Sequence, residues 1–200
     1  NMASVKQLCK SGVLLENGRV KYIGGINETV EHYIGDGGST ENQYFDDLST
    51  APGNDVIRIK SFEILPLDGS SQITIETGVL FRLKFMCYKE NAMLDANLQI
   101  STLDDIIVCE EEQVIGTVGA SDSKIGMYTI DFKLNPYTIN SGGYKANIYF
   151  GESMSYLIFD GFHQLFNVED TCTDRGGTAN PTKGYMRPFN NTFPCTWSKA

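Results

Sequence analysis

Apolar and polar residues alternate one by one along four stretches of the chain after residue 54. This alternation is typical of β-strands, in which one set of side chains enters a core and the other faces solvent. The inward-facing members that it predicts are Val79, Phe81, Leu83, Phe85 and Cys87; Tyr128, Ile130, Phe132 and Leu134; Tyr144, Ala146, Ile148 and Phe150; and Phe162, Gln164, Phe166 and Val168. From this set we expect Phe81, Leu83, Phe85, Ile130, Phe132, Ile148 and Phe166 in the core.

Further strands complete the pattern. The apolar positions of 57–64 change phase between Ile59 and Phe62, which predicts a β-bulge or a strand that changes sheets. Apolar runs at 97–103 and 106–109 bring the total to seven or eight strands. Because turn residues rather than helical patterns separate the strands, the sequence predicts an all-β fold: an antiparallel β-sandwich, immunoglobulin-like or jelly-roll, over residues 54–200.

The first 53 residues follow a different pattern. Asn17-Gly18 between two apolar runs predicts a hairpin over 13–23, and Asn27 can cap a short helix carrying Val30, Tyr33 and Ile34 on one side. One hairpin and one helix bury too little surface to fold alone, so residues 1–35 are predicted to be the tail of a larger domain. Residues 36–53 are rich in Gly, Ser, Asp and Asn and predict a linker, with Tyr44, Phe45 and Leu48 as a docking patch.

The composition limits the classes of binding partner and the cellular compartment that we expect for this protein. The chain has 16 Lys and Arg against 25 Asp and Glu, a net charge of -9, which disfavours nucleic acid and anionic membrane surfaces. It contains neither a long apolar run nor a secretion signal, and its five cysteines form no C-x-x-C pair. We therefore expect a soluble cytoplasmic protein in a reducing compartment.

No spacing of residues predicts a catalytic centre, a metal site or a cofactor. The histidines are His32 and His163 only, there is no Gly-Lys dipeptide for a P-loop, and His163, Cys172 and Cys195 match no compact zinc motif. The runs 110–112 and 104–105 are interpreted as a solvated acidic loop rather than a calcium or acid/base site. The covered chain is predicted not to be an enzyme.

The N-terminal block resembles the end of an ABC-transporter ATPase domain. The residues that carry the resemblance are Met2-Ala3-x-Val5-x-x-Leu8-Cys9, Val13-Leu14-Leu15-x-Asn17-Gly18-Arg19-Val20 and Ile23-Gly24. The resemblance implies that the ATPase catalytic motifs lie upstream of the covered chain. Asn140-Ser141-Gly142-Gly143-Tyr144 imitates the ABC signature, but it lies between two alternating strands and is interpreted as a hairpin turn.

The strand region resembles the C-terminal domain of Wzt-type ATPases, which export O-antigen polysaccharide. The motifs are Val56-x-Arg58-Ile59, Glu76-Thr77-Gly78 before Val79-x-Phe81-x-Leu83, Gly126-x-Tyr128-x-Ile130-x-Phe132, Ser141-Gly142-Gly143-Tyr144, and Phe166-x-Val168 before a Gly-rich stretch and Trp197. The resemblance implies a carbohydrate-binding domain that recognises the completed end of the polysaccharide in the cytoplasm. It also implies a homodimer, and a transporter complex with a membrane subunit at the inner membrane, within lipopolysaccharide biosynthesis.

A sugar site needs polar side chains for hydroxyls and an aromatic ring on which the sugar stacks. The outward positions of the strands offer both, and the candidate carbohydrate-binding residues are Arg82, Tyr88, Asn147, Tyr149 and His163. They form one groove if their strands are neighbours. Trp197 could stack on a sugar or plug the sandwich. The alternative functions are a dimerisation domain that couples ATPase subunits without binding sugar, and a secreted sugar-cleaving sandwich, which the odd cysteine count disfavours.

Overall fold

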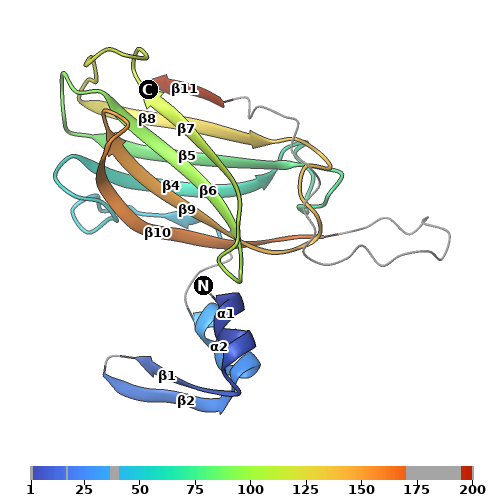
Figure 1. Ribbon diagram of the computed structural model, residues 1–200. Helices are drawn as coiled ribbons and strands as arrows, with labels where there is room; N and C mark the ends of the chain where they lie inside the picture. The colour runs from blue at the N-terminus through green and yellow to red at the C-terminus, as the bar shows by residue number, and fades with distance from the viewer. Residues whose placement is uncertain (1, 17, 37–40, 170–194, 200) are drawn as a thin grey trace.

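The computed structural model describes residues 2–16, 18–36, 41–169 and 195–199 and confirms the all-β sandwich. Figure 1 shows two layers of strands with a smaller N-terminal unit beside them. The strands of the sandwich are β3 (Gln43–Tyr44), β4 (Ile57–Pro66), β5 (Val79–Cys87), β6 (Leu94–Thr102), β7 (Ile107–Ile115), β8 (Gly126–Leu134), β9 (Gly142–Glu152), β10 (Tyr156–Val168) and β11 (Cys195–Lys199).

The strands form one five-stranded and one four-stranded antiparallel sheet. Their orders are β11-β8-β5-β4-β3 and β10-β9-β6-β7. The chain crosses between sheets after β5, β7, β8 and β10, so β8 pairs with β5 and β9 pairs with β6. Strands that follow one another in the sequence are therefore often in different sheets, and strands that pair are often separated along the chain.

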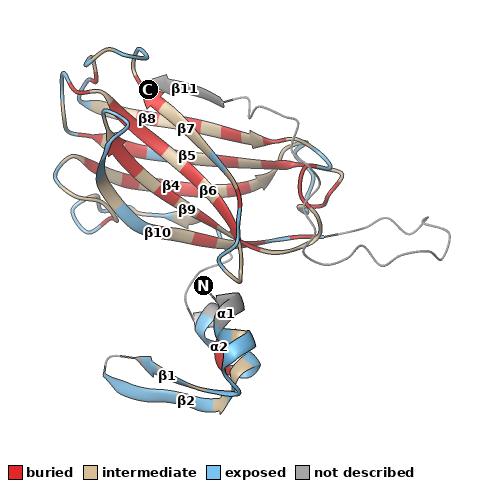
Figure 2. Ribbon diagram, viewed as in Figure 1, coloured by how far each residue is buried: buried red, intermediate tan, exposed pale blue. Residues whose placement is uncertain are grey.

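The core lies between the two sheets, as the red stripes of Figure 2 show. All seven residues predicted for the core are buried, which confirms that prediction. Rings from opposite sheets meet edge to face, with Phe85 and Phe150 centroids 4.8 Å apart and Phe81 and Phe166 centroids 5.3 Å apart. Such contacts stabilise the interface beyond the burial of their area.

The predicted bulge is present in β4. The register between β4 and β5 shifts between Ile59 and Ser61, which leaves Ile59 and Phe62 both fully buried. The intervening Lys60 donates a hydrogen bond through Nζ to the carbonyl of Phe45, 2.7 Å away. One extra residue thus reverses the inward phase of the strand.

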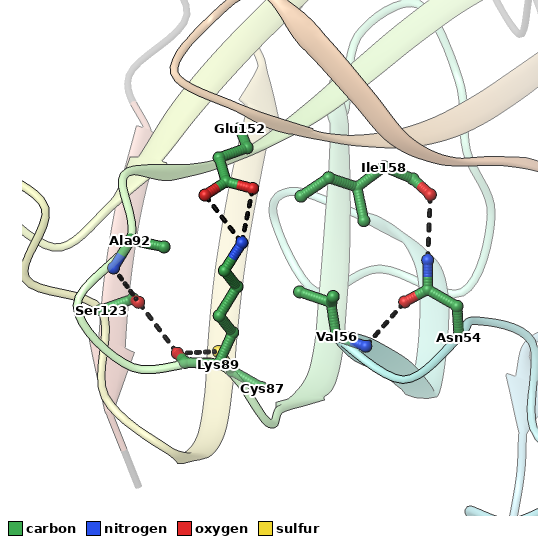
Figure 3. Close-up of polar contacts among 8 residues, drawn as sticks. All are labelled: Asn54, Val56, Cys87, Lys89, Ala92, Ser123, Glu152 and Ile158. Carbon is green, nitrogen blue, oxygen red and sulfur yellow. Dashed lines mark hydrogen bonds and ion pairs between the residues drawn. The ribbon is translucent and has the colours of Figure 1, made fainter.

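Polar contacts tie the sheets together at one end of the sandwich (Figure 3). Asn54 Nδ2 donates to the carbonyl of Ile158 in β10 over 2.9 Å, and Lys89 Nζ pairs with both carboxylate oxygens of Glu152 in β9. The fully buried Ser123 donates through Oγ to the carbonyl of Lys89 over 2.9 Å and accepts from the amide of Ala92 over 3.1 Å. These bonds satisfy loop backbone groups that burial would otherwise leave unpaired.

The N-terminal unit contains the predicted hairpin and helix. β1 (Ser11–Glu16) pairs with β2 (Arg19–Gly25), and α2 (Ile26–Asp36) follows. An additional helix, α1 (Met2–Leu8), precedes them. Thr29 and Val30 in α2 are buried, whereas most residues of the hairpin are exposed (Figure 2). The exposed residues of the hairpin include four apolar ones, Val13, Leu15, Val20 and Ile23, and the register places Val13 opposite Ile23 and Leu15 opposite Val20.

The described part of the predicted linker, residues 41–53, packs on the sandwich. β3 pairs with β4, and Phe45 lies with its ring 6.1 Å from that of Phe162. Tyr44 donates its hydroxyl to Glu63 Oε1 over 2.6 Å. The segment thus adds an edge strand to the five-stranded sheet and also contacts β10 of the other sheet.

Two local interpretations are wrong. Residues 110–112 belong to β7 rather than to a loop, because they pair with Gln99, Leu98 and Asn97 of β6. Glu110 and Glu112 therefore share one side of the sheet with Gln99 and Asn97, and Glu111 shares the inner side with the buried Leu98. The 140–144 turn is not a hairpin, because it joins β8 of one sheet to β9 of the other. Turn residues indicate that the chain changes direction. Whether the strands on either side of the turn pair with each other depends on the packing of the whole sandwich.

The chain end contributes the late strand β11, whose backbone pairs with β8. Cys172 lies outside the described residues, and so do the side chains of Cys195 and Trp197. Neither of the described helices is long and apolar enough to cross a membrane.

Candidate functional site

The outer face of the four-stranded sheet is a band of polar side chains. The register places Tyr149 of β9 opposite Asn97 of β6, and Asn147 opposite Gln99. On the other side of β6, Glu112 of β7 lies opposite Asn97, and Glu110 lies opposite Gln99. Because paired residues of an antiparallel sheet point to the same side, these groups form one surface.

Hydrogen bonds orient the amides of this surface. Tyr149 donates its hydroxyl to Gln99 Oε1 over 3.3 Å, and Asn97 Nδ2 donates to Asp95 Oδ1 over 2.9 Å. Asn147 Nδ2 lies 3.4 Å from both the carbonyl of Gln99 and Ser101 Oγ. The amides still have capacity for further bonds, since each carries two donor hydrogens and a carbonyl oxygen.

A pocket of about 480 Å³ opens on this face. Its polar lining comes from Asp95, Asn97 and Gln99 of β6 and from Glu110 and Glu112 of β7. Its aromatic lining includes Tyr149 and Tyr156. A pocket of this size with a few convergent polar groups is a candidate small-molecule site.

The turn between β9 and β10 forms an apolar rim of the pocket. Met154, Tyr156 and Leu157 line the pocket and are strongly exposed, at 59%, 72% and 64% respectively. Ser153 and Met154 both have left-handed φ angles, 57° and 53°. The amide of Ser153 donates to the carbonyl of Met93 over 2.7 Å, and the amide of Met154 lies 3.4 Å from Asp95 Oδ2. These contacts with Met93 and Asp95 hold the turn in a backbone conformation that is unfavourable for residues other than glycine. In this conformation the apolar side chain of Met154 is exposed to solvent.

Burial and mutual repulsion shape the charges in the pocket. Burial raises the pKa of Asp95, although hydrogen bonds from Asn97 and the Met154 amide oppose the shift. The pKa of Glu112 is raised by burial first, and then by the charges of Asp95 and Glu110. The pKa of Tyr149 is raised by burial and by the nearby carboxylates of Glu110, Asp160 and Asp105. The pocket therefore concentrates negative charge in a partly desolvated space.

The structure divides the five predicted site residues between two faces. Asn147, Tyr149 and His163 share the outer face of the four-stranded sheet, where His163 of β10 lies opposite Asn147. Of these three, Tyr149 lines the pocket. Arg82 lies on β5 and Tyr88 just after it, in the other sheet. One groove cannot contain all five side chains.

Arg82 already has a partner on its own sheet. Its Nε and Nη2 donate to the two carboxylate oxygens of Asp131 on β8, each over 2.8 Å. Hydrogen bonding to Asp131 raises the pKa of Arg82. We therefore interpret Arg82 and Asp131 as a structural pair that links β5 to β8.

In the sequence analysis, the pocket residues of β6 are not singled out, and those of β7 are assigned to a solvated acidic loop. Asp95, Asn97, Gln99 and Ser101 alternate with buried apolar residues, and this signal was available at 94–101. Only an apolar run at 97–103 is recognised here from the sequence. The alternation identifies the outward residues of β6, but no sequence pattern shows that β6 lies beside β9.

Other reactive groups of the described chain do not form a site. No cluster of three or more His, Cys, Asp or Glu side chains among the described residues is arranged to hold a metal ion. Burial raises the pKa of the Cys109 thiol to about 12, which keeps it protonated and unreactive at neutral pH.

No family model and no curated protein sequence matches the chain. The structure is similar to a crystal structure of the C-terminal domain of Wzt. The two share 16% sequence identity with a TM-score of 0.48, and the match covers 73% of this chain and 98% of that one.

Proposed function

We propose that this chain binds O-antigen polysaccharide in the cytoplasm, at its completed end, for export by an ABC transporter. The covered chain acts as a binding module without turnover. Its site is the outer face of the four-stranded sheet, with Tyr149 as the stacking ring and Asn147 and His163 as neighbouring polar contacts.

The observation that carries this proposal is the pocket that Tyr149 lines beside oriented amides. Sugar hydroxyls need fixed donors and acceptors, which Asn97 and Gln99 supply from β6. The apolar face of a sugar ring needs an aromatic surface, which Tyr149 and Tyr156 supply. The ordered motifs that resemble the C-terminal domain of Wzt-type ATPases favour a polysaccharide over other hydroxyl-rich ligands.

We further propose that residues 1–35 are the end of an ABC ATPase domain, that 36–53 connect it to the sandwich, and that 54–200 bind the glycan. The exposed apolar face of the β1–β2 hairpin supports a larger N-terminal domain, because a hairpin normally buries such a face. In this arrangement the protein is a homodimer that joins a membrane subunit of the transporter. Sedimentation of the purified chain measures its molecular mass in solution: twice the mass of one chain would support the homodimer, and the mass of one chain would contradict it.

The direct test is calorimetric titration with the polysaccharide of the organism that supplies the protein. Wild type is expected to show saturable binding. Tyr149→Ala and Asn147→Ala are expected to weaken it by about tenfold or more, the equivalent of about 1.4 kcal/mol. Their melting temperatures should stay close to that of wild type, since both side chains lie on an outer face.

Tyr88→Ala is the matched control, because it removes the same kind of side chain from an exposed position that follows β5 and does not line the pocket. It should bind like wild type. Loss of binding in Tyr88→Ala and Arg82→Ala with retention in Tyr149→Ala would move the site to the five-stranded sheet. Absence of binding by the wild type would overturn the proposed function.

A further inference from the structure

The charge of the pocket has a consequence for the sugar that it accepts. We propose that the pocket on the outer face of the four-stranded sheet binds a sugar residue carrying a free ammonium group. This proposal rests on the proposed glycan-binding function and specifies its ligand: an amino sugar that is not N-acetylated, at the end of the glycan or along it.

Three carboxylates line the pocket from two neighbouring strands. Asp95 lies on β6, and Glu110 and Glu112 lie on β7 on the same outer face. None of the described residues that line the pocket is a lysine, arginine or histidine. A cation entering this space would therefore meet uncompensated negative charge.

The lysines near the sheet have other partners. Lys145 of β9 pairs with Asp105 in the β6–β7 turn, and Lys89 pairs with Glu152 over 2.7 Å. Neither side chain belongs to the lining of the pocket. The carboxylates of the pocket are thus not neutralised by these two cations.

Asp95 contributes a buried carboxylate at the bottom of the pocket. Its side chain is almost completely buried, with Oδ1 accepting from Asn97 and Oδ2 facing the amide of Met154. These two contacts orient the carboxylate toward Asn97 and the turn between β9 and β10. Glu112, opposite Asn97 on β7, lines the same pocket and is less buried than Asp95, so its carboxylate can meet an ammonium directly.

The aromatic and apolar lining suits the rest of such a sugar. Tyr149 and Tyr156 can stack on the ring and attract an ammonium through their π faces. Met154 and Leu157 provide apolar contacts at the rim. The same carboxylates would repel a phosphorylated sugar or a uronic acid, so the pocket selects on charge as well as shape.

The experiment compares a short glucosamine oligomer with its N-acetylated counterpart of the same length, near pH 6.5, by calorimetry and amide NMR shifts. The two probes share ring and linkage but differ in the ammonium group. The glucosamine oligomer should bind at least about tenfold tighter, with shifts centred on β6, β7 and β9. Raising the salt concentration should reduce this preference, because it depends on charge.

The variant Glu112→Gln should lose most of this preference. Glu111→Gln is the matched control, because it removes an identical charge from the adjacent residue, which faces the other side of β7. It should keep the preference. If both variants lose it equally, the attraction comes from the overall negative charge of the protein and the proposal is overturned.

Equal or tighter binding of the N-acetylated oligomer would also overturn the proposal, as would binding of neither oligomer. The proposed function would survive these results if the native polysaccharide still bound in a Tyr149-dependent manner. The two failures are therefore distinguishable in a single set of titrations.

Discussion

The carboxylate of Asp95 lies directly over the backbone of Gly151, its cross-strand partner on β9. A Cβ at position 151 would overlap Asp95 Oδ1. Glycine at this position therefore leaves room for the buried carboxylate that forms the base of the pocket. This close approach couples the shape of the pocket to one residue of the sheet.

Gly151→Ala should displace Asp95 and weaken its bonds to Asn97 and the Met154 amide. We expect a loss of roughly 1–3 kcal/mol in the free energy of unfolding, as for other overpacked sites. Urea denaturation measures it. Gly25→Ala is the control, since a Cβ there meets only ordinary contacts with Glu28, and an equal loss in both variants would contradict the prediction.

The hydroxyl and the ring of Tyr149 should contribute separately to glycan binding. Tyr149→Phe removes the bond to Gln99 Oε1 but keeps the stacking surface, so it should retain most of the affinity. Tyr149→Ala should lose about tenfold or more because the ring is removed. Calorimetry with the same polysaccharide measures both, and equal losses would show that the ring does not stack on the sugar.

The pKa of Glu112 predicts a pH dependence of stability. Burial and the charges of Asp95 and Glu110 raise this pKa above its ordinary value. Between the two values the folded protein binds a proton that the unfolded chain does not, so the contribution of Glu112 to stability decreases as pH rises through that window. Tyr149, whose pKa is also raised, stays neutral there.

Glu112→Gln should therefore be at least as stable as wild type at pH 7, and its advantage should shrink as the pH is lowered through the window. Urea unfolding at a series of pH values measures the difference. Glu90→Gln removes an exposed carboxylate outside the pocket and serves as the control. An advantage of Glu112→Gln that grew on acidification would contradict the assignment.

The pair between Arg82 and Asp131 should stabilise the five-stranded sheet without affecting sugar binding. A double-mutant cycle with Arg82→Ala and Asp131→Ala is expected to show a coupling of at most about 1 kcal/mol, because solvent screens the partly exposed guanidinium. Affinity for the polysaccharide should not change. A loss of affinity in both single variants would place the ligand on this sheet instead.

Ser123→Ala should loosen the end of the sandwich shown in Figure 3. It removes the acceptor of the Ala92 amide and the donor to the Lys89 carbonyl, both within a buried region. We expect a loss of about 1–3 kcal/mol in the free energy of unfolding. Ser70→Ala, at an exposed turn, should cost much less, and similar losses in the two variants would refute the role of Ser123.

Much of the fold could be predicted because strand alternation is a local property. Residues such as Phe81, Ile130 and Ile148 enter the core on whichever sheet their strand lies, since the period of two separates buried from outward positions. The phase change between Ile59 and Phe62 revealed the bulge for the same reason.

The alternation within each strand does not determine which residues form the site, because the site combines side chains from different strands. The sequence determined that Arg82, Asn147 and Tyr149 point outward, but not that β5 and β9 lie in different sheets. Only the tertiary structure placed Asp95 and Glu112 beside Tyr149, because strand adjacency depends on crossovers and on packing between residues far apart in the chain. Side-chain direction follows from the backbone of each strand, whereas the neighbours of a side chain follow from the free energy of the whole sandwich.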